Sequence, residues 1–401
     1  MTRAAAPAVQ TVALAAACAA ALSLAACRSG PVPGPVPGPH PGPNPVRDTP
    51  KAADEAAALD PGPASPTTRV AEERALMGTT FRIVVDCDGV TQEVRDALEA
   101  AFAAVRTVED WASDWSAESE ARQVTARAER VAPGTPIALS SALWEHLAFA
   151  LDVAARTEGA FDPTLGTLTR LWRRSARLGE LPSPARLAEA RAVAGYAHVA
   201  LDPARPALSF DAPGVRLDLG GSAKGEALDR AFEVLSSRGF SRVLIDGGGD
   251  LRLGAPPRGE PGWRVELAPL GPGAGALRFT AAHCAIATSG DAQQSFALDG
   301  VRYGHILDPM TGLGLTARRA ATVFAPDGRT ADALATALVV RGAEGSALFG
   351  PTGPFPEAAG AVFEPGKFPA CVTEGFPQDG GHVEGARHAE QTEPRAPMNL
   401  R

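Results

Sequence analysis

The chain has 401 residues, of which 45% are hydrophobic and 5% are aromatic. Its 46 acidic side chains outnumber its 38 lysines and arginines, which gives a formal net charge of −8 at pH 7. This negative balance argues against a general nucleic-acid binder, because the nucleic-acid backbone is itself anionic. Roughly 300 residues remain between the two terminal segments, enough for one large domain or two closely joined ones.

The first residues predict a secretory signal peptide. Arg3 supplies a positive charge, and residues 12–26 form an uncharged run, rich in Ala and Leu, that is too short for a stable membrane anchor. The run ends in Leu24-Ala25-Ala26-Cys27, the pattern of a bacterial lipobox, in which the cysteine becomes lipid-modified and forms the new N-terminus. Ordinary cleavage to a soluble protein is the alternative, since small residues also suit signal peptidase. We expect residues 1–26 to be removed and lipid on Cys27 to anchor the protein to a membrane of the cell envelope, facing the periplasm or the cell exterior.

The segments that flank the folded region are rich in proline, glycine and polar residues. Residues 27–69 include Gly30-Pro31-Val32-Pro33-Gly34, and proline at this density favours an extended, semi-rigid spacer over a packed core. Residues 372–401 contain no apolar period and are expected to be disordered. The sequence therefore predicts a single large domain over residues 70–371 behind a disordered tether.

The first part of this domain predicts a strand and three helices. The strand covers residues 81–85, and an amphipathic helix follows over residues 90–115, with apolar side chains at helical spacing. A second helix is expected over residues 139–157, beginning at a capping serine, and a third over residues 184–192.

The remainder predicts short strands separated by Gly and Asp clusters at hairpin-like intervals, with one helix over residues 222–237. This order favours an α+β fold, with largely antiparallel sheets and packed helices, over a repeating βαβ unit. The strands are expected at residues 207–210, 215–219, 242–245, 251–253, 263–267, 277–280, 285–288, 295–298 and 320–324.

One stretch of this region suits an anionic ligand. An apolar run with Val215, Leu217 and Leu219 leads into Gly220-Gly221-Ser222-Ala223-Lys224-Gly225, where the helix begins. Glycines let the backbone approach a ligand closely, and a helix start directs unpaired N–H groups and partial positive charge at an anion. We expect a phosphate group to bind here.

A second stretch suits a divalent cation. In Ala331-Asp332-Ala333-Leu334-Ala335-Thr336, a carboxylate and a hydroxyl lie at i and i+4 of a predicted helix, about 5–6 Å apart at Cβ. Two hard oxygens one turn apart suit Mg²⁺, which usually takes few protein ligands and keeps phosphate oxygens and waters for the rest. Together the two stretches predict an enzyme or binder that acts on a phosphate ester.

Five further segments accompany these two in a specific order. Taken singly, most of them are typical turn sequences. They are Ala75-Leu76-Met77-Gly78-Thr79-Thr80-Phe81, residues 113–120, Gly159-Ala160-Phe161-Asp162-Pro163-Thr164-Leu165-Gly166, Asp246-Gly247-Gly248-Gly249-Asp250, and residues 287–291 leading to His305-Ile306-Leu307-Asp308-Pro309-Met310-Thr311-Gly312.

In this order the segments resemble the FAD:protein FMN transferases of the ApbE family, over about residues 70–365. The most telling motifs lie at residues 220–225, 305–312 and 331–336. The resemblance implies an ApbE-like, T-fold-like domain that uses FAD as substrate and moves FMN to a Thr or Ser hydroxyl of a target protein, with Mg²⁺ and release of AMP. It also implies a membrane redox subunit as the target. Many family members lie outside the cytoplasmic membrane, in agreement with the lipobox.

The resemblance also implies which residues form the site. Asp332, Thr336 and the backbone carbonyl of Gly221 would hold the metal, although Asp332 could instead interact with the helix dipole and Thr336 with its own helix backbone. Trp115 offers a flat face for ring stacking, but a tryptophan that ends an amphipathic helix is as often part of the core. A solvated lysine is the alternative for Lys224. The implied FAD contacts are Met77, Trp115, Ala160, Phe161, Asp162, Asp218, Lys224 and Leu307.

His305 is the candidate acceptor of the proton from the attacking hydroxyl, because the unperturbed pKa of histidine, about 6.5, lies near working pH. The alternative is a histidine held in a turn by Asp308, which is also the next candidate for the base. Two other functions remain open: a Mg²⁺-dependent FAD pyrophosphatase, in which water replaces the protein hydroxyl, and a non-catalytic FAD-binding lipoprotein.

Three cysteines lie in the folded region. Cys87, Cys284 and Cys371 are widely spaced and form no C-x-x-C pair, so neither a disulfide framework nor a zinc site is indicated. One disulfide bridge and three buried thiols both remain possible readings of this set.

Overall fold

The computed structural model describes residues 68–267, 277–290, 295–364, 367–377 and 381–384, which all fall within one unit, Pro61–Arg401. The predicted signal peptide, the lipid site Cys27 and nearly all of the tether lie outside the described residues. Within the described ranges, no helix is both long and apolar enough to cross a membrane.

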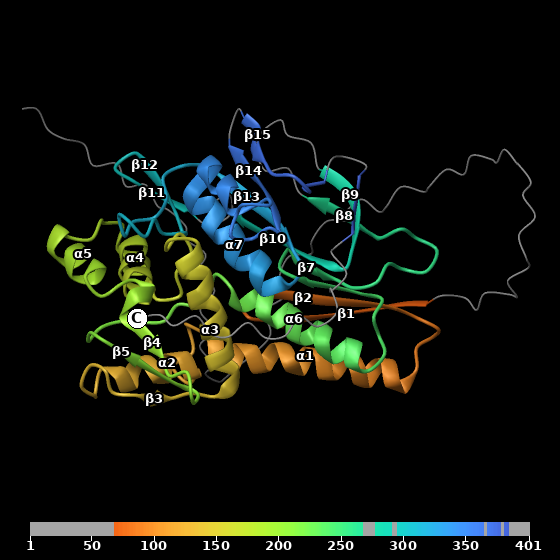
Figure 1. Cartoon of the computed structure of the whole chain (residues 1–401), viewed down its shortest axis with the longest axis horizontal. Coiled ribbons are helices and arrows are strands. Elements are labelled where there is room, and N and C mark those ends of the chain that lie inside the picture. The colour runs from red at the N-terminus through yellow and green to blue at the C-terminus, as the bar shows by residue number, and fades with distance from the viewer. Residues whose placement is uncertain (1–67, 268–276, 291–294, 365–366, 378–380, 385–401) are drawn as a thin grey trace, which may run out of the picture. The chain divides into compact units, whose positions relative to one another are not determined.

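The main sheet of the described region has eight antiparallel strands in the order β1-β2-β6-β7-β10-β13-β14-β15 (Figure 1). Alternate residues face opposite sides: on β2, Ile83 and Val85 join one core and Val84 joins another. The strands are β1 (Thr68–Leu76), β2 (Thr79–Cys87), β6 (Val243–Gly247), β7 (Asp250–Leu253), β10 (Cys284–Gly290), β13 (Ala320–Ala325), β14 (Ala359–Glu364) and β15 (Lys367–Val372).

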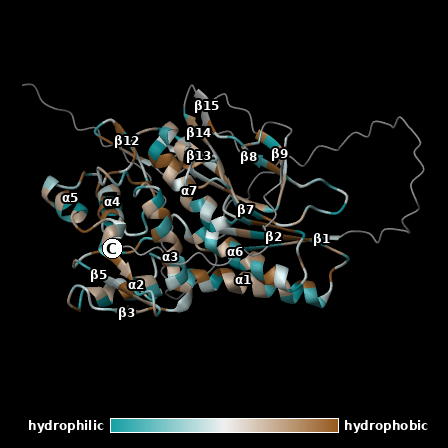
Figure 2. Cartoon of the chain, viewed as in Figure 1, coloured by the Kyte–Doolittle hydropathy of each residue, from teal (hydrophilic) through white to brown (hydrophobic). Residues whose placement is uncertain are grey.

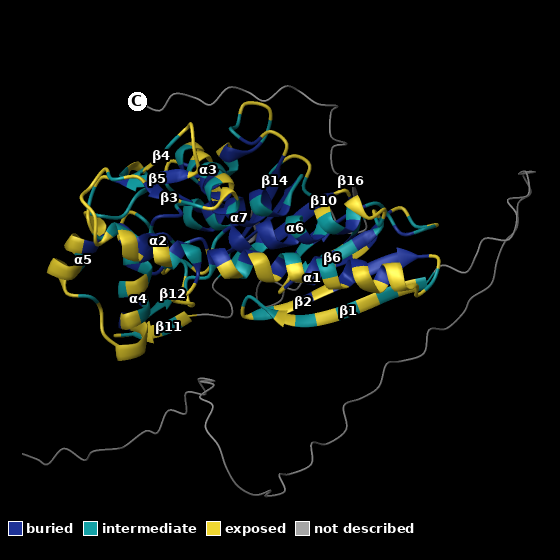
Figure 3. Ribbon diagram, turned by 90° about the horizontal axis from the view of Figure 1, so that it is seen from below, coloured by how far each residue is buried: buried dark blue, intermediate teal, exposed yellow. Residues whose placement is uncertain are grey.

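Helices α1 (Gln92–Ala112), α6 (Ala223–Ser237) and α7 (Gly328–Arg341) cover one face of this sheet. Along α1, hydrophilic and hydrophobic residues interchange (Figure 2), as expected for a helix with one buried side. Helices α6 and α7 pack closely because both have glycine at the contact: a Cβ on Gly225 would lie 2.1 Å from the carbonyl oxygen of Gly328. Figure 3 shows that most residues of both helices are buried or half-buried.

A small sheet packs against the other face of the main sheet. Its strands are β8 (Trp263–Leu267), β9 (Leu277–Ala282) and β16 (His382–Glu384), and Trp263 and Phe279 join a core with Phe324 of β13. Strand β16 pairs in parallel with β9. The expectation of a disordered segment over residues 372–401 therefore does not hold for residues 382–384, because strand pairing uses backbone groups and needs no apolar period.

The remaining elements form two smaller sheets and several helices. A three-stranded sheet has the order β3-β5-β4, and β11 pairs with β12. The elements are α2 (Glu120–Ala128), β3 (Ile137–Ala138), α3 (Ser141–Arg156), α4 (Gly166–Leu178), α5 (Pro184–Arg191), η1 (Tyr196–His198), β4 (Val199–Leu201), β5 (Ala207–Phe210), β11 (Ser295–Leu298), β12 (Val301–Gly304) and η2 (Gly342–Leu348).

This architecture confirms the predicted α+β class, with largely antiparallel sheets and packed helices. The predicted strand over residues 215–219 is wrong: the segment is extended, but its only ladder contact with other described residues is a parallel bridge between Leu165 and Arg216. Val215 and Leu217 still bury their side chains, so a strand-like pattern arises without a strand partner. Among the described cysteines, Cys87 and Cys284 are buried free thiols.

Candidate active site

The glycine loop at residues 220–221 joins the extended segment to α6. The N–H of Asp218 donates to the carbonyl of Pro163 at 2.7 Å, which holds this segment against the loop before α4. A Cβ on Gly221 would lie 3.2 Å from both the Phe161 ring and the Thr336 hydroxyl oxygen. The fold therefore brings Gly221, Phe161 and Thr336 together.

Lys224, in the first turn of α6, lies between two buried carboxylates. Its ammonium is 2.7 Å from Asp250 Oδ2 and 3.1 Å from Asp332 Oδ1. Burial lowers the pKa of Lys224, but the two carboxylates outweigh it and hold the pKa above its ordinary value. Asp332 also accepts the N–H of Gly225 at 3.1 Å, so this carboxylate joins the start of α6 to α7.

The atoms around Asp332 and Thr336 suit a hard cation by their chemistry. The Thr336 hydroxyl lies one helical turn from Asp332 and 3.4 Å from the hydroxyl of Ser289. Within the described residues, no three His, Cys, Asp or Glu side chains gather into a metal cluster. An ion here would need hydroxyl, backbone and substrate oxygens in addition to one carboxylate, a donor set that fits Mg²⁺ and not zinc.

Two further predicted contacts, Asp162 and Asp218, organise the loops around them. Asp162 accepts the backbone N–H groups of Thr164 and Tyr196, each at 2.8 Å. Burial raises the pKa of Asp162, although these hydrogen bonds oppose the shift. Asp218 accepts the hydroxyl of Thr169 at 2.6 Å and thereby ties the glycine loop to α4. The same carboxylates that could meet a ligand therefore also fix the backbone.

Met77 lies in the turn between β1 and β2, with a positive φ of 51°. Its N–H donates to Glu109 at 3.1 Å, and the nearby Thr80 carbonyl accepts the N–H of Gly248 at 3.1 Å. This places the turn beside the glycine-rich turn that precedes Asp250. The structure thus gathers the Met77 turn, Asp250, Lys224 and α7 at one end of the sheet.

Trp115 lies after α1 and is 80% exposed, so it is not the core residue considered as the alternative. The Arg173 guanidinium of α4 covers its ring, 4.2 Å from the centroid, and also pairs with Asp114. The ring contact that Trp115 makes among the described residues is with Arg173, and its flavin role stays a prediction.

The loop after β12 carries His305, Leu307 and Asp308. His305 is exposed, whereas Leu307 is 7% exposed and packs with Leu168 and Trp172. Asp308 accepts the N–H of Met310 at 2.8 Å and the Thr311 hydroxyl at 3.1 Å, so it holds its own turn. The geometry therefore gives Asp308 a structural task and leaves the proton-acceptor role of His305 as a prediction.

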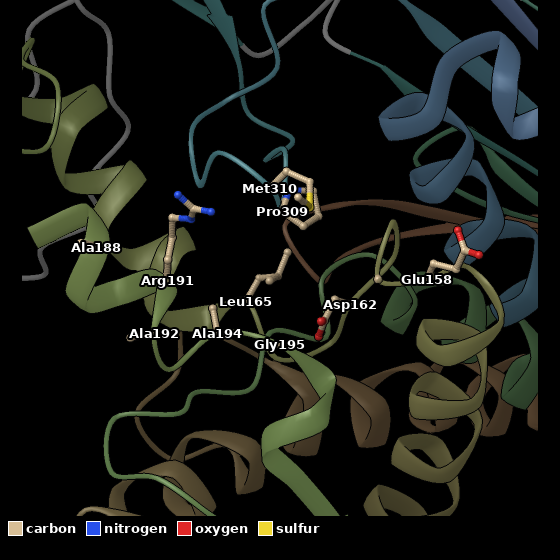
Figure 4. Close-up of a pocket in the computed structure, with 11 residues that line it drawn as sticks. Glu158, Asp162, Leu165, Ala188, Arg191, Ala192, Ala194, Gly195, Pro309 and Met310 are labelled. Carbon is tan, nitrogen blue, oxygen red and sulfur yellow. The ribbon is translucent and has the colours of Figure 1, made fainter. Parts of the chain in front are cut away.

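A cavity of about 420 Å³ opens between this loop and the segment that contains Asp162 (Figure 4). Pro309 and Met310 line one side, and Asp162, Leu165 and Arg191 are among the residues that line the others. Gly159 also lines the cavity, and the buried residues Ala160 and Phe161 follow it in the sequence. The segments at residues 159–166 and 305–312, which are far apart in the chain, thus line the same cavity.

The sequence motifs assign no role to two groups beside the start of α6. Asp250 ends a glycine-rich turn in the sequence, and its contact with Lys224 is made only in the folded chain. His146 lies outside any motif and is fully buried, with Nε2 3.0 Å from Ser222 Oγ and Nδ1 3.3 Å from Glu226. The sequence does place His146 on the apolar side of its helix, beside Leu143 and Leu147, and this position could have indicated a buried histidine.

The sequence profile of the ApbE family matches residues 77–351. The FAD:protein FMN transferase of Treponema pallidum is 33% identical over 292 residues, which are 68% of this chain and 78% of that protein. The corresponding protein of Vibrio cholerae is 32% identical over 280 residues, 67% of this chain and 80% of its own length.

Solved structures agree with these matches. The flavin transferase ApbE from Vibrio cholerae superposes with a TM-score of 0.64 at 28% identity, covering 74% of this chain and 94% of that structure. The ApbE protein of Thermotoga maritima gives a TM-score of 0.61 at 31% identity, covering 68% and 87%.

Proposed function

The chain belongs to the ApbE family, as the order of its motifs predicted, and from this premise we propose that it is an FAD:protein FMN transferase. A Thr or Ser hydroxyl of a target protein attacks the phosphorus of the FMN half of FAD. A bond forms between the hydroxyl oxygen and that phosphorus, while the bond from the phosphorus to the oxygen of AMP breaks. AMP leaves with the electron pair, and the hydroxyl proton passes to a base on the enzyme.

The observation that supports this best is the ammonium of Lys224 at the glycine loop, fixed by Asp250 and Asp332. A fixed positive charge at a helix start offsets negative charge that develops on a pyrophosphate as AMP leaves. Because the glycines at residues 220–221 carry no side chains, the phosphates can approach the backbone. Catalysis of this kind comes mainly from positioning and electrostatic stabilisation.

Asp332, Thr336 and the Gly221 carbonyl would hold Mg²⁺, whose donor preference they fit. When bound, the ion supplies further neutralisation of the pyrophosphate charge. Asp250, which contacts Lys224 but is absent from this set, keeps the ammonium in place whether or not Asp332 also ligates a cation.

The remaining predicted contacts would position FAD around this centre. We assign the cavity beside Asp162 and Met310 to part of the FAD molecule, because two of the segments that carry the family resemblance, residues 159–166 and 305–312, line it. Trp115, with one ring face covered by Arg173, keeps its other face for a flavin or adenine ring. Met77, Ala160, Phe161, Asp218 and Leu307 complete the proposed contacts.

His305 would take the proton from the attacking hydroxyl. It is exposed on the loop that follows β12, where a protein acceptor can reach it. An imidazole titrates close to neutral pH and can therefore accept a proton during the transfer and release it afterwards.

The target would be a membrane redox subunit outside the cytoplasm, reached from a lipid anchor on Cys27. The lipobox at residues 24–27 and the spacer-like composition of residues 27–69 support this location. A lipid anchor and a long spacer keep an enzyme near a membrane while leaving it free to reorient.

Incubation of the full chain with FAD and Mg²⁺, with and without such a subunit, tests the proposal. Chromatography measures AMP and FMN, and in-gel fluorescence measures flavin bound to the subunit; the matched control replaces the acceptor Thr of the subunit with Val. AMP release in step with flavinylated subunit supports the transferase. Free FMN and AMP without flavinylation would indicate a pyrophosphatase, and intact bound FAD a non-catalytic binder.

A further inference from the structure

Helix α4 carries a row of arginines in an otherwise acidic chain. Arg170, Arg174 and Arg177, here called the arginine stripe, lie at i, i+4 and i+7 and therefore share one side of the helix. All three are exposed, and α4 contains no acidic residue. Leu168 and Trp172 pack the opposite side of α4 into the protein. Figure 3 shows the exposed surface of α4 at the edge of the molecule.

The arginine stripe has no partner within the described part of the chain. Arg173 pairs with Asp114 and Arg216 pairs with Glu129, but no ion pair is formed there by any of the three stripe residues. Surface arginines elsewhere are commonly paired: on α6, for instance, Arg230 contacts three carboxylates. The stripe is thus an uncompensated positive surface.

Further positive charge lies next to the stripe. Burial lowers the pKa of Arg216; its partner Glu129 opposes this shift, and the nearby Arg170 and Arg122 add to it. Like charges gathered in this way repel one another, and an anionic partner would relieve the repulsion.

The helix that carries the stripe adjoins the candidate active site. Thr169, next to Arg170, donates its hydroxyl to Asp218 at 2.6 Å. Trp172 donates its indole N–H to the carbonyl of Gly304 at 3.2 Å, directly before His305. Helix α4 therefore adjoins both the glycine loop and the proposed base, and the stripe extends over about 10 Å along the exposed side of the same helix.

We infer that the arginine stripe docks an acidic segment of the acceptor protein, so that the acceptor hydroxyl enters the site beside it. This inference rests on the proposed function, which requires a protein substrate at this place. A short acidic segment meets only the stripe, whereas an extended anionic surface such as a lipid bilayer would also meet the chain's net charge of −8. Guanidinium groups suit carboxylates because they form paired hydrogen bonds with them.

Charge reversal in the full chain, R170E/R174E/R177E, tests the inference. The KM for the acceptor should rise roughly tenfold or more at low salt, because complementary charge mainly speeds encounter. The kcat and the affinity for FAD should remain unchanged, and the difference in KM should shrink as salt is added. The matched control, R95E/R106E/R238E, makes the same change of charge at exposed arginines of α1 and at the end of α6. It should leave the KM within about twofold.

An unchanged acceptor KM in R170E/R174E/R177E would overturn the inference, as would an equal rise in the control. Loss of binding to anionic vesicles with a normal acceptor KM would assign the stripe to a membrane instead. FAD affinity reports folding; if the reversed chain fails to bind FAD, the neutral R170Q/R174Q/R177Q chain takes its place, with a smaller rise expected. Absence of transfer by the wild-type chain would reject the proposed function itself, and the inference with it.

Discussion

The Lys224 ammonium and the Asp332 carboxylate position each other, and Asp250 secures the ammonium from the other side. A change at Asp332 therefore removes one of two anchors of Lys224 and leaves the second. The Gly225 N–H loses its acceptor in the same change. A variant at Asp332 changes both the charge of the site and these contacts, whereas a variant at Thr336 removes only a neutral hydroxyl. Comparison of the activity and stability of the two variants can thus separate effects on charge from effects on folding.

Asp332→Ala should abolish Mg²⁺-dependent AMP release while the protein still folds, and Thr336→Val should weaken it less. The order follows from charge, because a carboxylate offsets a cation and a neutral hydroxyl only adds a dipole. AMP release against Mg²⁺ concentration, with thermal unfolding as the control, measures both. Full activity of Asp332→Ala would place the metal elsewhere.

His305→Ala should slow flavin transfer by about 10²–10⁴-fold, the usual range for a lost general base, with little change in FAD affinity. The acid limb of the pH–rate profile should also disappear, since the group whose deprotonation it reports is gone. FAD titration and rate against pH on the same variant decide this. Weaker FAD binding and lower thermal stability with the acid limb retained would instead make His305 a residue that holds the turn.

At the scale of elements, α6 depends on glycine where it meets α7. In Gly225→Ala the new Cβ would lie 2.1 Å from the Gly328 carbonyl, so the helices must separate and the free energy of unfolding should fall by about 3 kcal/mol or more. Gly179→Ala is the control: its φ of 67° is strained for alanine, but nothing lies within 4 Å, so about 1 kcal/mol is expected. Chemical denaturation measures both. Equal losses would show that the helices can adjust at this contact.

His146 of α3 contacts Glu226 of α6, and the stabilisation from this contact should depend on pH. His146 and two arginines outweigh the burial of Glu226 and lower its pKa to about 2 from 4.5. A lowered pKa means that the stabilisation, on the order of 3 kcal/mol, is complete above pH 4.5 and is lost as the pH falls toward 2. Glu226→Gln should therefore flatten the pH dependence of the unfolding free energy between these values. An unchanged slope in that range would contradict the assignment.

The helices and strands with a clear period could be predicted from the sequence, whereas others could not. The helix expected over residues 139–157 exists as α3, with Ser140 as its cap. The pattern at residues 215–219 repeats every second residue, but burial alone, without a neighbouring strand, explains it. Helix α4 was missed because its start coincides with a motif that suggested a loop. For the candidate site, local motifs gave Lys224 and Asp332, but Asp250 depends on a contact made only in the folded chain.

At the scale of the whole molecule, the arginine stripe and the predicted anchor would both promote the encounter of the enzyme with a large acceptor protein. If residues 28–67 adopt the extended spacer conformation that their composition favours, they span up to about 120 Å. An enzyme on such a tether would search a wide area of membrane, and the stripe would then orient each encounter. The anchor would therefore act on the local concentration of the enzyme and the stripe on the orientation of the acceptor.

Cys27→Ser should move the mature protein from the detergent phase to the aqueous phase while soluble assays of AMP release remain normal. A diacylated cysteine buries many CH₂ groups at about 0.8 kcal/mol each, far more than a polar spacer contributes, so a single atom at residue 27 should decide the partition. Detergent phase separation followed by immunoblotting measures it, and mass spectrometry of the N-terminal peptide gives the modification. Unchanged partitioning of the variant would reject the lipid anchor, whereas lost AMP release in solution would show that residue 27 also affects the folded domain.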